Sequence, residues 1–197
     1  MANNFDNQNT NVLTGTTGAD IFDSTQSGAV TYMAGLTGND IYYIDGSNTG
    51  DQVVELVGGG TDTIFVVNDG WYVFAANIEN GTVDDGGGGA ISGNELNNVL
   101  NVTATSGDAW IWGYGGNDKI TGGSGSDSLY GGYGNDTING GVGGNDNLYG
   151  DLGYTDLGSL GGNDVIIGAS TTNDTVGYIG GYVFYGDTSD SITDGGV

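Results

Sequence analysis

Aspartate residues at a fixed spacing are the main candidates for chemistry in this chain. Asp118, Asp127 and Asp136 are nine residues apart, and Asp146 follows ten residues later. A glycine-rich run precedes each of them. Glycine allows backbone conformations that a Cβ atom forbids, so each run predicts a tight turn that presents a carboxylate at its end. The chemistry open to the chain is therefore that of repeated carboxylates on glycine turns.

The elements that position these carboxylates are short β-strands. An aliphatic residue stands two positions after each aspartate of the central array: Ile120, Leu129, Ile138 and Leu148. Side chains alternate between the two faces of a strand, so the middle residue of a three-residue strand points inward. No window has convincing helical periodicity with caps. The array from Gly113 to Gly150 therefore predicts short strands separated by glycine turns.

These units resemble the RTX, or haemolysin-type, repeat G-G-x-G-x-D-x-U-x, in which U is a large apolar residue. The resemblance implies an all-β fold, a right-handed parallel β-roll or β-solenoid, in which motif n stacks on motif n+2. It thus implies that Asp118 stacks with Asp136 and Asp127 with Asp146. It also implies several calcium ions in the glycine-rich turns, held by aspartate carboxylates and backbone carbonyls, which are oxygen ligands that suit this hard cation.

Degenerate copies of the motif extend the resemblance over nearly the whole chain. The aspartates that take the carboxylate position, and are expected to bind metal, are Asp20, Asp40, Asp62, Asp118, Asp127, Asp136, Asp146, Asp164 and Asp174. Phe22, Tyr42 and Ile64 take the inward position of the early copies. Residues 38–101 resemble a longer unit of large RTX proteins, with an N-hydrophobic-E-N signature at 77–80. Asn98 replaces aspartate there, so we expect a turn without metal.

The sequence divides into three segments, and the second and third are also compatible with one continuous solenoid. Residues 1–12 are a polar N-terminal arm, expected to be disordered or to dock as a strand on a neighbouring molecule. Residues 13–101 are a degenerate RTX-like β region. Residues 102–197 are an RTX β-roll that ends in a capping or secretion segment. Within that segment, the aromatic run 178–186 predicts a terminal strand pair that covers the last coil.

Aromatic side chains outside the motif positions raise the question of a ligand platform. Alternation places Trp110 and Trp112 on one face and Ile111 on the other, and we favour the interpretation that the indoles fill the core. In the central array, the side chains beside each inward aliphatic point to solvent. If Asp164 lies two motifs beyond Asp146, then Tyr130, Tyr149 and Ile167 form one exposed ladder.

Composition excludes several functional classes. The formal net charge is −24, with Lys119 as the one basic residue, and the chain has no His or Cys. Catalytic triads and thiol sites are thereby excluded, so we expect no enzyme activity. Nucleic acid is excluded as a partner, because no basic patch can meet its phosphates. No apolar run approaches the roughly 20 residues of a membrane-spanning helix, so we expect no membrane insertion.

The first residues predict the route of export. Residues 1–11 have neither the positive region nor the apolar region of a secretory signal peptide. The RTX resemblance implies type I secretion from a Gram-negative bacterium through an uncleaved C-terminal signal. We therefore expect a secreted protein that lies outside the cell or on its surface.

Two main hypotheses for function follow. The first is an extracellular structural protein that folds on calcium and binds copies of itself to form a filament or surface layer, because repeats fill nearly the whole chain. The second is a calcium-dependent adhesin or binding module, with a cell-surface polysaccharide as a partner. Ice binding requires a flat Thr and Asn array, and Thr17 and Thr37 make a sparse one. A third hypothesis is the C-terminal secretion module of a larger RTX protein.

Overall fold

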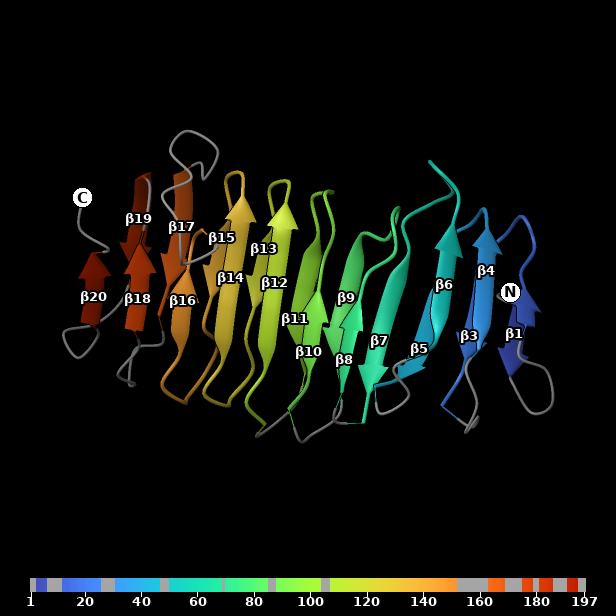
Figure 1. Ribbon diagram of the computed structural model, residues 1–197, viewed down its shortest axis with the longest axis horizontal. Coiled ribbons are helices and arrows are strands. Elements are labelled where there is room, and N and C mark those ends of the chain that lie inside the picture. The colour runs from blue at the N-terminus through green and yellow to red at the C-terminus, as the bar shows by residue number, and fades with distance from the viewer. Residues whose placement is uncertain are drawn as a thin grey trace.

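The computed structural model describes residues 3–6, 12–25, 31–46, 50–68, 70–84, 88–103, 107–151, 163–168, 175–178, 181–185 and 191–194. These residues form a flattened solenoid of β-strands, with the N-terminal strands at one end and the C-terminal strands at the other (Figure 1). The described segments contain no helix that is long and apolar enough to cross a membrane. The expected all-β solenoid is confirmed.

Every strand pair is parallel, and the strands lie in three sheets. One face is a ten-stranded sheet of β1 (Asn3–Asp6), β3 (Asp20–Asp23), β5 (Ile41–Asp45), β7 (Thr63–Val67), β9 (Asn80–Val83), β11 (Val99–Val102), β13 (Lys119–Thr121), β15 (Thr137–Asn139), β17 (Asn163–Ile167) and β19 (Gly181–Tyr185). The opposite face has a three-stranded sheet of β2 (Val12–Thr14), β4 (Tyr32–Leu36) and β6 (Gln52–Glu55). It continues with a seven-stranded sheet of β8 (Trp71–Val73), β10 (Ala90–Ser92), β12 (Trp110–Gly115), β14 (Ser128–Tyr133), β16 (Asn147–Tyr149), β18 (Thr175–Tyr178) and β20 (Ser191–Asp194).

Two motifs make one coil, as predicted. Strand β13 pairs with β15, with Ile120 opposite Ile138, and β14 pairs with β16, with Leu129 opposite Leu148. Successive strands in the chain therefore lie on opposite faces, and the same face is reached again one coil later. This register places equivalent motif positions directly above one another, which is the condition for stacking the aspartates.

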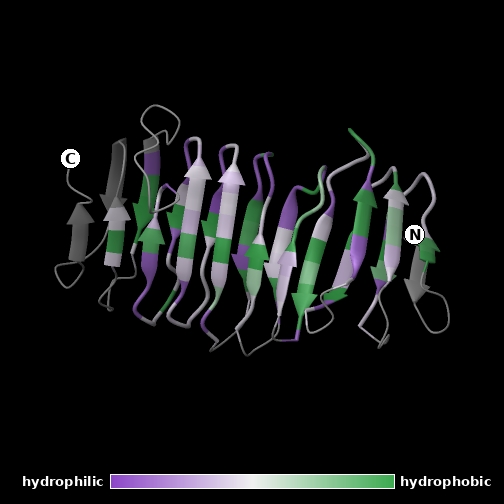
Figure 2. Cartoon of the chain, in the orientation of Figure 1, coloured by the Kyte–Doolittle hydropathy of each residue, from purple (hydrophilic) through white to green (hydrophobic). Residues whose placement is uncertain are grey.

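The core is the narrow space between the two faces. The inward side chains are fully or almost fully buried, and those predicted from the motifs are Phe22, Tyr42, Ile64, Ile120, Leu129, Ile138 and Leu148. Figure 2 shows hydrophobic bands that alternate with polar ones along the strands. In the wider N-terminal coils the rings of Phe22 and Tyr42 stack with centroids 4.8 Å apart. Burial of aliphatic and aromatic side chains contributes about 1.5–3 kcal/mol each.

The two faces differ in continuity. Strand β11 pairs with β13, so the ten-stranded sheet runs without a break across residue 102. The opposite face is divided between β6 and β8, where the Val53 amide donates to the Tyr72 hydroxyl at 3.2 Å. At the N-terminal end, residues 3–6 of the expected polar arm form β1, which pairs with β3.

Three expectations about outward side chains and terminal strands were wrong. Ile111 is buried and Trp110 is 49% exposed, which is the reverse of the prediction, so the indoles of β12 do not fill the core. Strand β17 pairs with β15 instead of β16, which places Ile167 opposite Asn139 and leaves Gly177 opposite Tyr149. Strands β18 and β19 lie in different sheets, so the run 178–186 is not a strand pair.

The exposed ladder follows a different set of residues. Trp71, Trp112, Tyr130 and Tyr149 form an aromatic ladder along the seven-stranded sheet. The Trp112 and Tyr130 rings stack with centroids 5.6 Å apart, and the Tyr130 and Tyr149 rings with centroids 4.8 Å apart. The Trp71 ring is tilted against Trp112 at 6.3 Å. Because Trp112, Tyr130 and Tyr149 cover each other's faces, this ladder presents ring edges to solvent and is not a stacking platform for a flat ligand.

Candidate metal centre

Buried carboxylates form a ladder along one edge of the solenoid. The predicted ligands on this edge are Asp20, Asp40, Asp62, Asp118, Asp136 and Asp164, each at most 4% exposed. In four pairs, the Oδ1 atom of the later aspartate accepts the backbone N–H of the aspartate one coil earlier. These bonds, of 2.7 to 2.8 Å, join Asp20 to Asp40, Asp40 to Asp62, Asp118 to Asp136, and Asp136 to Asp164. The stacking of Asp118 with Asp136 is thus confirmed.

The other edge carries a shorter ladder. Asp127 accepts the Ala109 amide at 2.8 Å, and Asp146 accepts the Asp127 amide at 2.9 Å. Asp127 and Asp146 are buried and stacked as predicted. Asp174 lies outside the described residues. Ala109 occupies the position that an aspartate takes in the next coil, so this ladder begins at Asp127.

Glu79 is a member of the first ladder that was not predicted, whereas Asn98 takes the aspartate position as predicted. Glu79 accepts the Asp62 amide at 2.8 Å, and so takes the place of an aspartate between Asp62 and Asn98. Asn98 donates its side-chain amide to the carbonyls of Ile78 and Glu79 at 2.9 and 3.2 Å. Its neutral side chain is satisfied by the backbone, in keeping with a turn that needs no metal. The N-hydrophobic-E-N signature was the available signal for Glu79.

The second carboxylate oxygen distinguishes two kinds of turn. In the turns of Asp20 and Asp127, Oδ2 accepts the amide of the second turn residue, Thr16 or Gly123. Asn98 makes the same bond through Oδ1 to the Asn94 amide at 3.0 Å. These closed turns satisfy their own side chain. A carboxylate in a closed turn has one oxygen fewer to offer a cation.

The turns of Asp40, Asp118 and Asp136 are open. Their second residues, Leu36, Tyr114 and Gly132, have left-handed φ angles of 76°, 76° and 117°. The Oδ2 atoms of the three aspartates are buried and have no hydrogen-bond partner. Leaving a buried carboxylate oxygen unsatisfied is costly, and coordination of a cation removes that cost.

Glycine at the first turn position makes room for these oxygens. A Cβ atom at Gly113 would overlap Oδ2 of Asp118, and one at Gly131 would overlap Oδ2 of Asp136. The residues therefore fit a calcium ion: oxygen donors only, unsatisfied and buried, with the backbone held back from them. Asp40, Asp118 and Asp136 are the residues best placed to hold it. A bound cation would supply the positive charge that the ladder lacks.

A second ladder of polar side chains ties the coils in the opposite direction. Asn117 and Asn135, which precede Asp118 and Asp136, are exposed. Asn117 accepts the Asn135 amide at 2.8 Å, and Asn97 accepts the Asn117 amide at 2.7 Å. Here each side chain accepts from the following coil, whereas each aspartate accepts from the preceding one. This explains the Asn-Asp pair in the motif, which sequence reasoning did not interpret.

Burial perturbs the ionisation of the ladder. Desolvation raises the pKa of Asp118, Asp136 and Asp164 to about 7, against hydrogen bonds from backbone amides that lower it. Neighbouring carboxylates raise the pKa of Asp136 and Asp164 further. The only basic side chain of the chain is Lys119, so the ladder must be neutralised by protons or by cations from solution.

This perturbation predicts acid-induced folding in chelator. The folded pKa values lie above the ordinary value of 3.8, so the folded chain binds more protons than the unfolded chain between about pH 7 and 4. Stability of the metal-free chain should therefore rise as pH falls from 8 to 5. We expect the β-sheet circular dichroism signal in chelator to increase over that range. A signal that stays flat or decreases would contradict this assignment of the buried acids.

Together, the fold and the ladders define a class: parallel β-solenoids with carboxylate-bearing glycine turns that suit calcium. Residues 92–129, 112–144 and 121–156 match the family described as RTX calcium-binding nonapeptide repeat (4 copies). The chain therefore carries RTX repeats, and calcium is their cofactor, with several ions. No curated protein and no solved structure matched the chain in the other two comparisons.

Proposed function

We propose that this protein is an extracellular structural protein that folds on calcium and assembles with copies of itself into a filament or surface layer. The observation that carries the proposal is the ladder of buried carboxylates in a chain with one basic residue. Such a ladder fills the solenoid edge and leaves the fold dependent on a cation. The fold is thus built around binding calcium, and its outer surfaces remain free for assembly.

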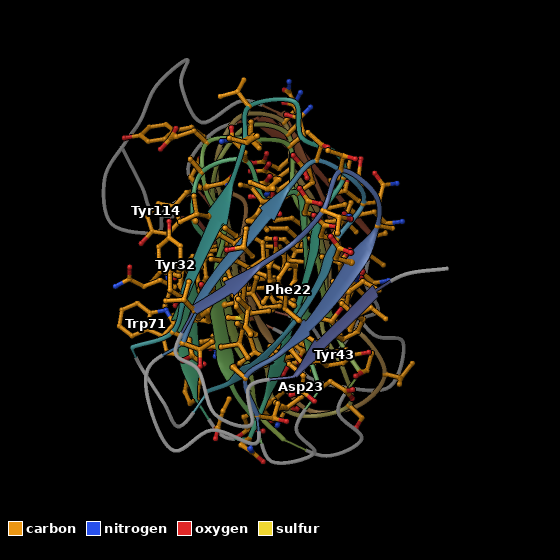
Figure 3. The ribbon with its side chains drawn as sticks, turned by 90° about the vertical axis from the view of Figure 1, so that its right-hand side faces the viewer. Phe22, Asp23, Tyr32, Tyr43, Trp71 and Tyr114 are labelled. Atoms are coloured by element: carbon orange, nitrogen blue, oxygen red, sulfur yellow. The ribbon has the colours of Figure 1, made fainter. Side chains whose placement is uncertain are left out.

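The outer surface of the seven-stranded sheet supports assembly. Trp71 and Trp110 lie on β8 and β12 in the same row, with Ala90 between them, and are 56% and 49% exposed. Figure 3 looks along the solenoid and places Phe22 in the interior, with Trp71, Tyr32 and Tyr114 along one flank. An exposed apolar stripe usually marks an interface. Strand edges at the two ends of the solenoid offer backbone hydrogen bonds to a further subunit.

Secretion is part of the same proposal. RTX repeats are typical of secreted proteins of Gram-negative bacteria. Inside a cell, where free calcium is low, the carboxylates would repel one another and keep the chain expanded. Outside, calcium would bind the folded chain and stabilise it by mass action. Export as an unfolded chain followed by folding on calcium explains why the fold depends on an external ion.

Assembly is tested with a single outward substitution. We expect wild-type protein in millimolar calcium to form ordered assemblies that are visible by electron microscopy. Trp110→Ser should raise the concentration needed for assembly about tenfold or more, because buried Trp side chains dominate interface energies. Val57→Ser is the control, since Val57 is exposed in a turn away from the seven-stranded sheet.

Two outcomes would contradict assembly. Light scattering that reports only monomers at high protein concentration in millimolar calcium would contradict the proposal that the protein forms a filament or layer. If wild type and Trp110→Ser assemble equally well, the exposed row of Trp71 and Trp110 is not the contact surface. In the first case the binding-module hypothesis becomes the better one.

One observation favours that second hypothesis, a calcium-dependent adhesin. A groove of about 480 Å³ lies beside the exposed aromatic residues, lined in part by Val73, Phe74, Leu96 and Tyr114. Its apolar lining and the acidic side chain of Glu95 suit a neutral, partly apolar ligand such as a cell-surface polysaccharide better than an anion. Binding of such a polysaccharide by monomeric protein, lost in Tyr114→Ser, would support the adhesin.

A further inference from the structure

Three carboxylates meet inside the N-terminal coils, where one of them belongs to no nonapeptide. Asp40 precedes β5, Asp62 precedes β7, and Glu55 is the last residue of β6 on the opposite face. One oxygen from each of the three side chains lies within 4.8 Å of the other two. Among the described residues, these three are the one such group of potential metal ligands. We call them the acidic triad.

Glu55 stands where the solenoid elsewhere has glycine. Met33 pairs with Val53 and Ala34 with Val54, after which the register shifts and Leu36 pairs with Glu55. In the sequence, Glu55 comes two residues after the buried Val53, as Gly35 comes two residues after the buried Met33 one coil earlier. A Cβ atom at Gly35 would overlap Glu55 Oε1 and Asp40 Oδ2, so the absent side chain of Gly35 leaves the space that the Glu55 carboxylate enters. The local sequence thus adds a third carboxylate to a turn that otherwise has two.

Two oxygens of this group are buried and unsatisfied. Asp40 is 1% exposed and Glu55 7% exposed, and neither Asp40 Oδ2 nor Glu55 Oε2 has a hydrogen-bond partner. The other oxygens are used: Asp40 Oδ1 accepts the Asp20 amide, and Glu55 Oε1 accepts the Tyr42 hydroxyl. Tyr42 thereby orients Glu55 so that its free oxygen stays among the other carboxylates.

No side chain can neutralise the acidic triad. Lys119, the one basic residue, lies on β13, and β9 and β11 separate that strand from β7 in the ten-stranded sheet. All three carboxylates are buried, and a buried carboxylate in its ionised form is destabilised unless an opposite charge is close to it. Three such groups with two unsatisfied oxygens need a ligand of opposite charge.

We propose that Asp40, Glu55 and Asp62 together hold one calcium ion, with Glu55 as a ligand from outside the nonapeptide repeats. The separation suits this ion, because two oxygens that bind one calcium at its usual bond lengths of about 2.3–2.6 Å lie at most about 4.6–5.2 Å apart. The acidic triad carries more negative charge than a pair of stacked aspartates. It is therefore the tightest site, and it anchors the N-terminal coils. The proposal rests on calcium-dependent folding as proposed above.

Counting bound ions tests the site. Calcium per chain is measured by equilibrium dialysis on the full chain, for wild type and for Glu55→Gln, which keeps the side-chain volume and an acceptor for Tyr42. We expect Glu55→Gln to bind one ion fewer, or to bind its first ion at least about tenfold more weakly. Asp84→Asn is the matched control, because Asp84 is exposed and one negative charge is likewise removed. It should bind as wild type does.

The outcomes separate the two proposals. An unchanged count and affinity in Glu55→Gln, with one ion lost in Asp136→Asn, would overturn the triad site alone. A wild-type chain that binds no calcium would overturn the triad site and calcium-dependent folding together. Circular dichroism in saturating calcium checks that Glu55→Gln is folded.

A second measurement tests the site even if Glu55→Gln does not fold. Terbium occupies calcium sites and luminesces when a nearby tyrosine is excited, and Tyr42 donates to Glu55. The first equivalent of terbium should go to the site with the highest negative charge. Tyr42→Phe keeps the ring that stacks on Phe22, but should lose most of the luminescence from that first equivalent. Luminescence equal to that of wild type would overturn the proposal.

Discussion

At pH 8, excess chelator is expected to abolish the β-sheet circular dichroism signal of this protein, and millimolar calcium to restore it. The reason is the balance of charge: the chain carries −24, and its buried ladder has no basic partner. Each ion that binds only the folded chain contributes about 2.7 kcal/mol at a concentration 100 times its Kd. Together, several such ions contribute an amount comparable to the 5–15 kcal/mol by which domains are usually stable. A folded spectrum in excess chelator would show that calcium is not required.

A substitution in an open turn should shift this transition. Asp136→Asn keeps an oxygen for the Asp118 amide, as Asn98 does for Asn94, but it removes the charge and the unsatisfied oxygen. We expect the calcium concentration at half-folding to rise about tenfold or more. Asp23→Asn is the control, because Asp23 is outside the ladder and its carboxylate accepts from Thr25. Equal midpoints in the two variants would contradict a role for Asp136 in binding.

The central repeats were predictable because their spacing is regular. A nine-residue unit with one inward aliphatic fixes which side chains face the core, and stacking on the second unit along fixes which aspartates meet. Ile120 and Ile138, and Asp118 and Asp136, follow from this rule without further information. Interior packing then needs only side chains of similar size at equivalent positions in each coil.

Irregular segments broke the rule. Between Asp146 and Asp164 the sequence departs from the nine-residue spacing, so the spacing does not give the number of strands that intervene. The face predicted for Ile167 was therefore wrong. The outward orientation of Trp110, by contrast, could have been predicted from the sequence. Asp127 minus one coil of 18 residues gives Ala109, and the residue two positions after it, Ile111, must be the inward one. Alternation alone separates two faces but does not say which is buried.

Acidic residues outside the motif were the least predictable. Glu55 reaches the Asp40 turn from the opposite sheet, and Glu79 enters the ladder in place of aspartate. Both depend on how the longer unit between the arrays folds back on the solenoid. A sequence pattern gives positions along the chain, whereas the Glu55 contact joins strands on two faces and the Glu79 contact replaces the motif aspartate with a longer side chain.

The second large effect is expected from a glycine in the central array. Gly134 has a φ of 120°, and a Cβ atom there would overlap the carbonyl oxygen of Gly116 in the preceding coil. Gly134→Ala thus combines a conformation that costs about 1–2 kcal/mol for a residue with a side chain with a clash against backbone that cannot move without separating two coils. We expect more than about 3 kcal/mol of lost unfolding free energy, measured by urea denaturation in saturating calcium.

A matched glycine separates the two causes. Gly143 lies in the same array with a φ of 96°, but the nearest atom to a Cβ there is the Ser124 carbonyl oxygen at 3.4 Å. Gly143→Ala should therefore lose only the conformational part, about 1–2 kcal/mol. The difference between the two variants measures how firmly the calcium-bearing turns fix the distance between coils. Equal losses would mean that neighbouring coils move apart at little cost, and the ladder of aspartate and amide groups could not then hold its register.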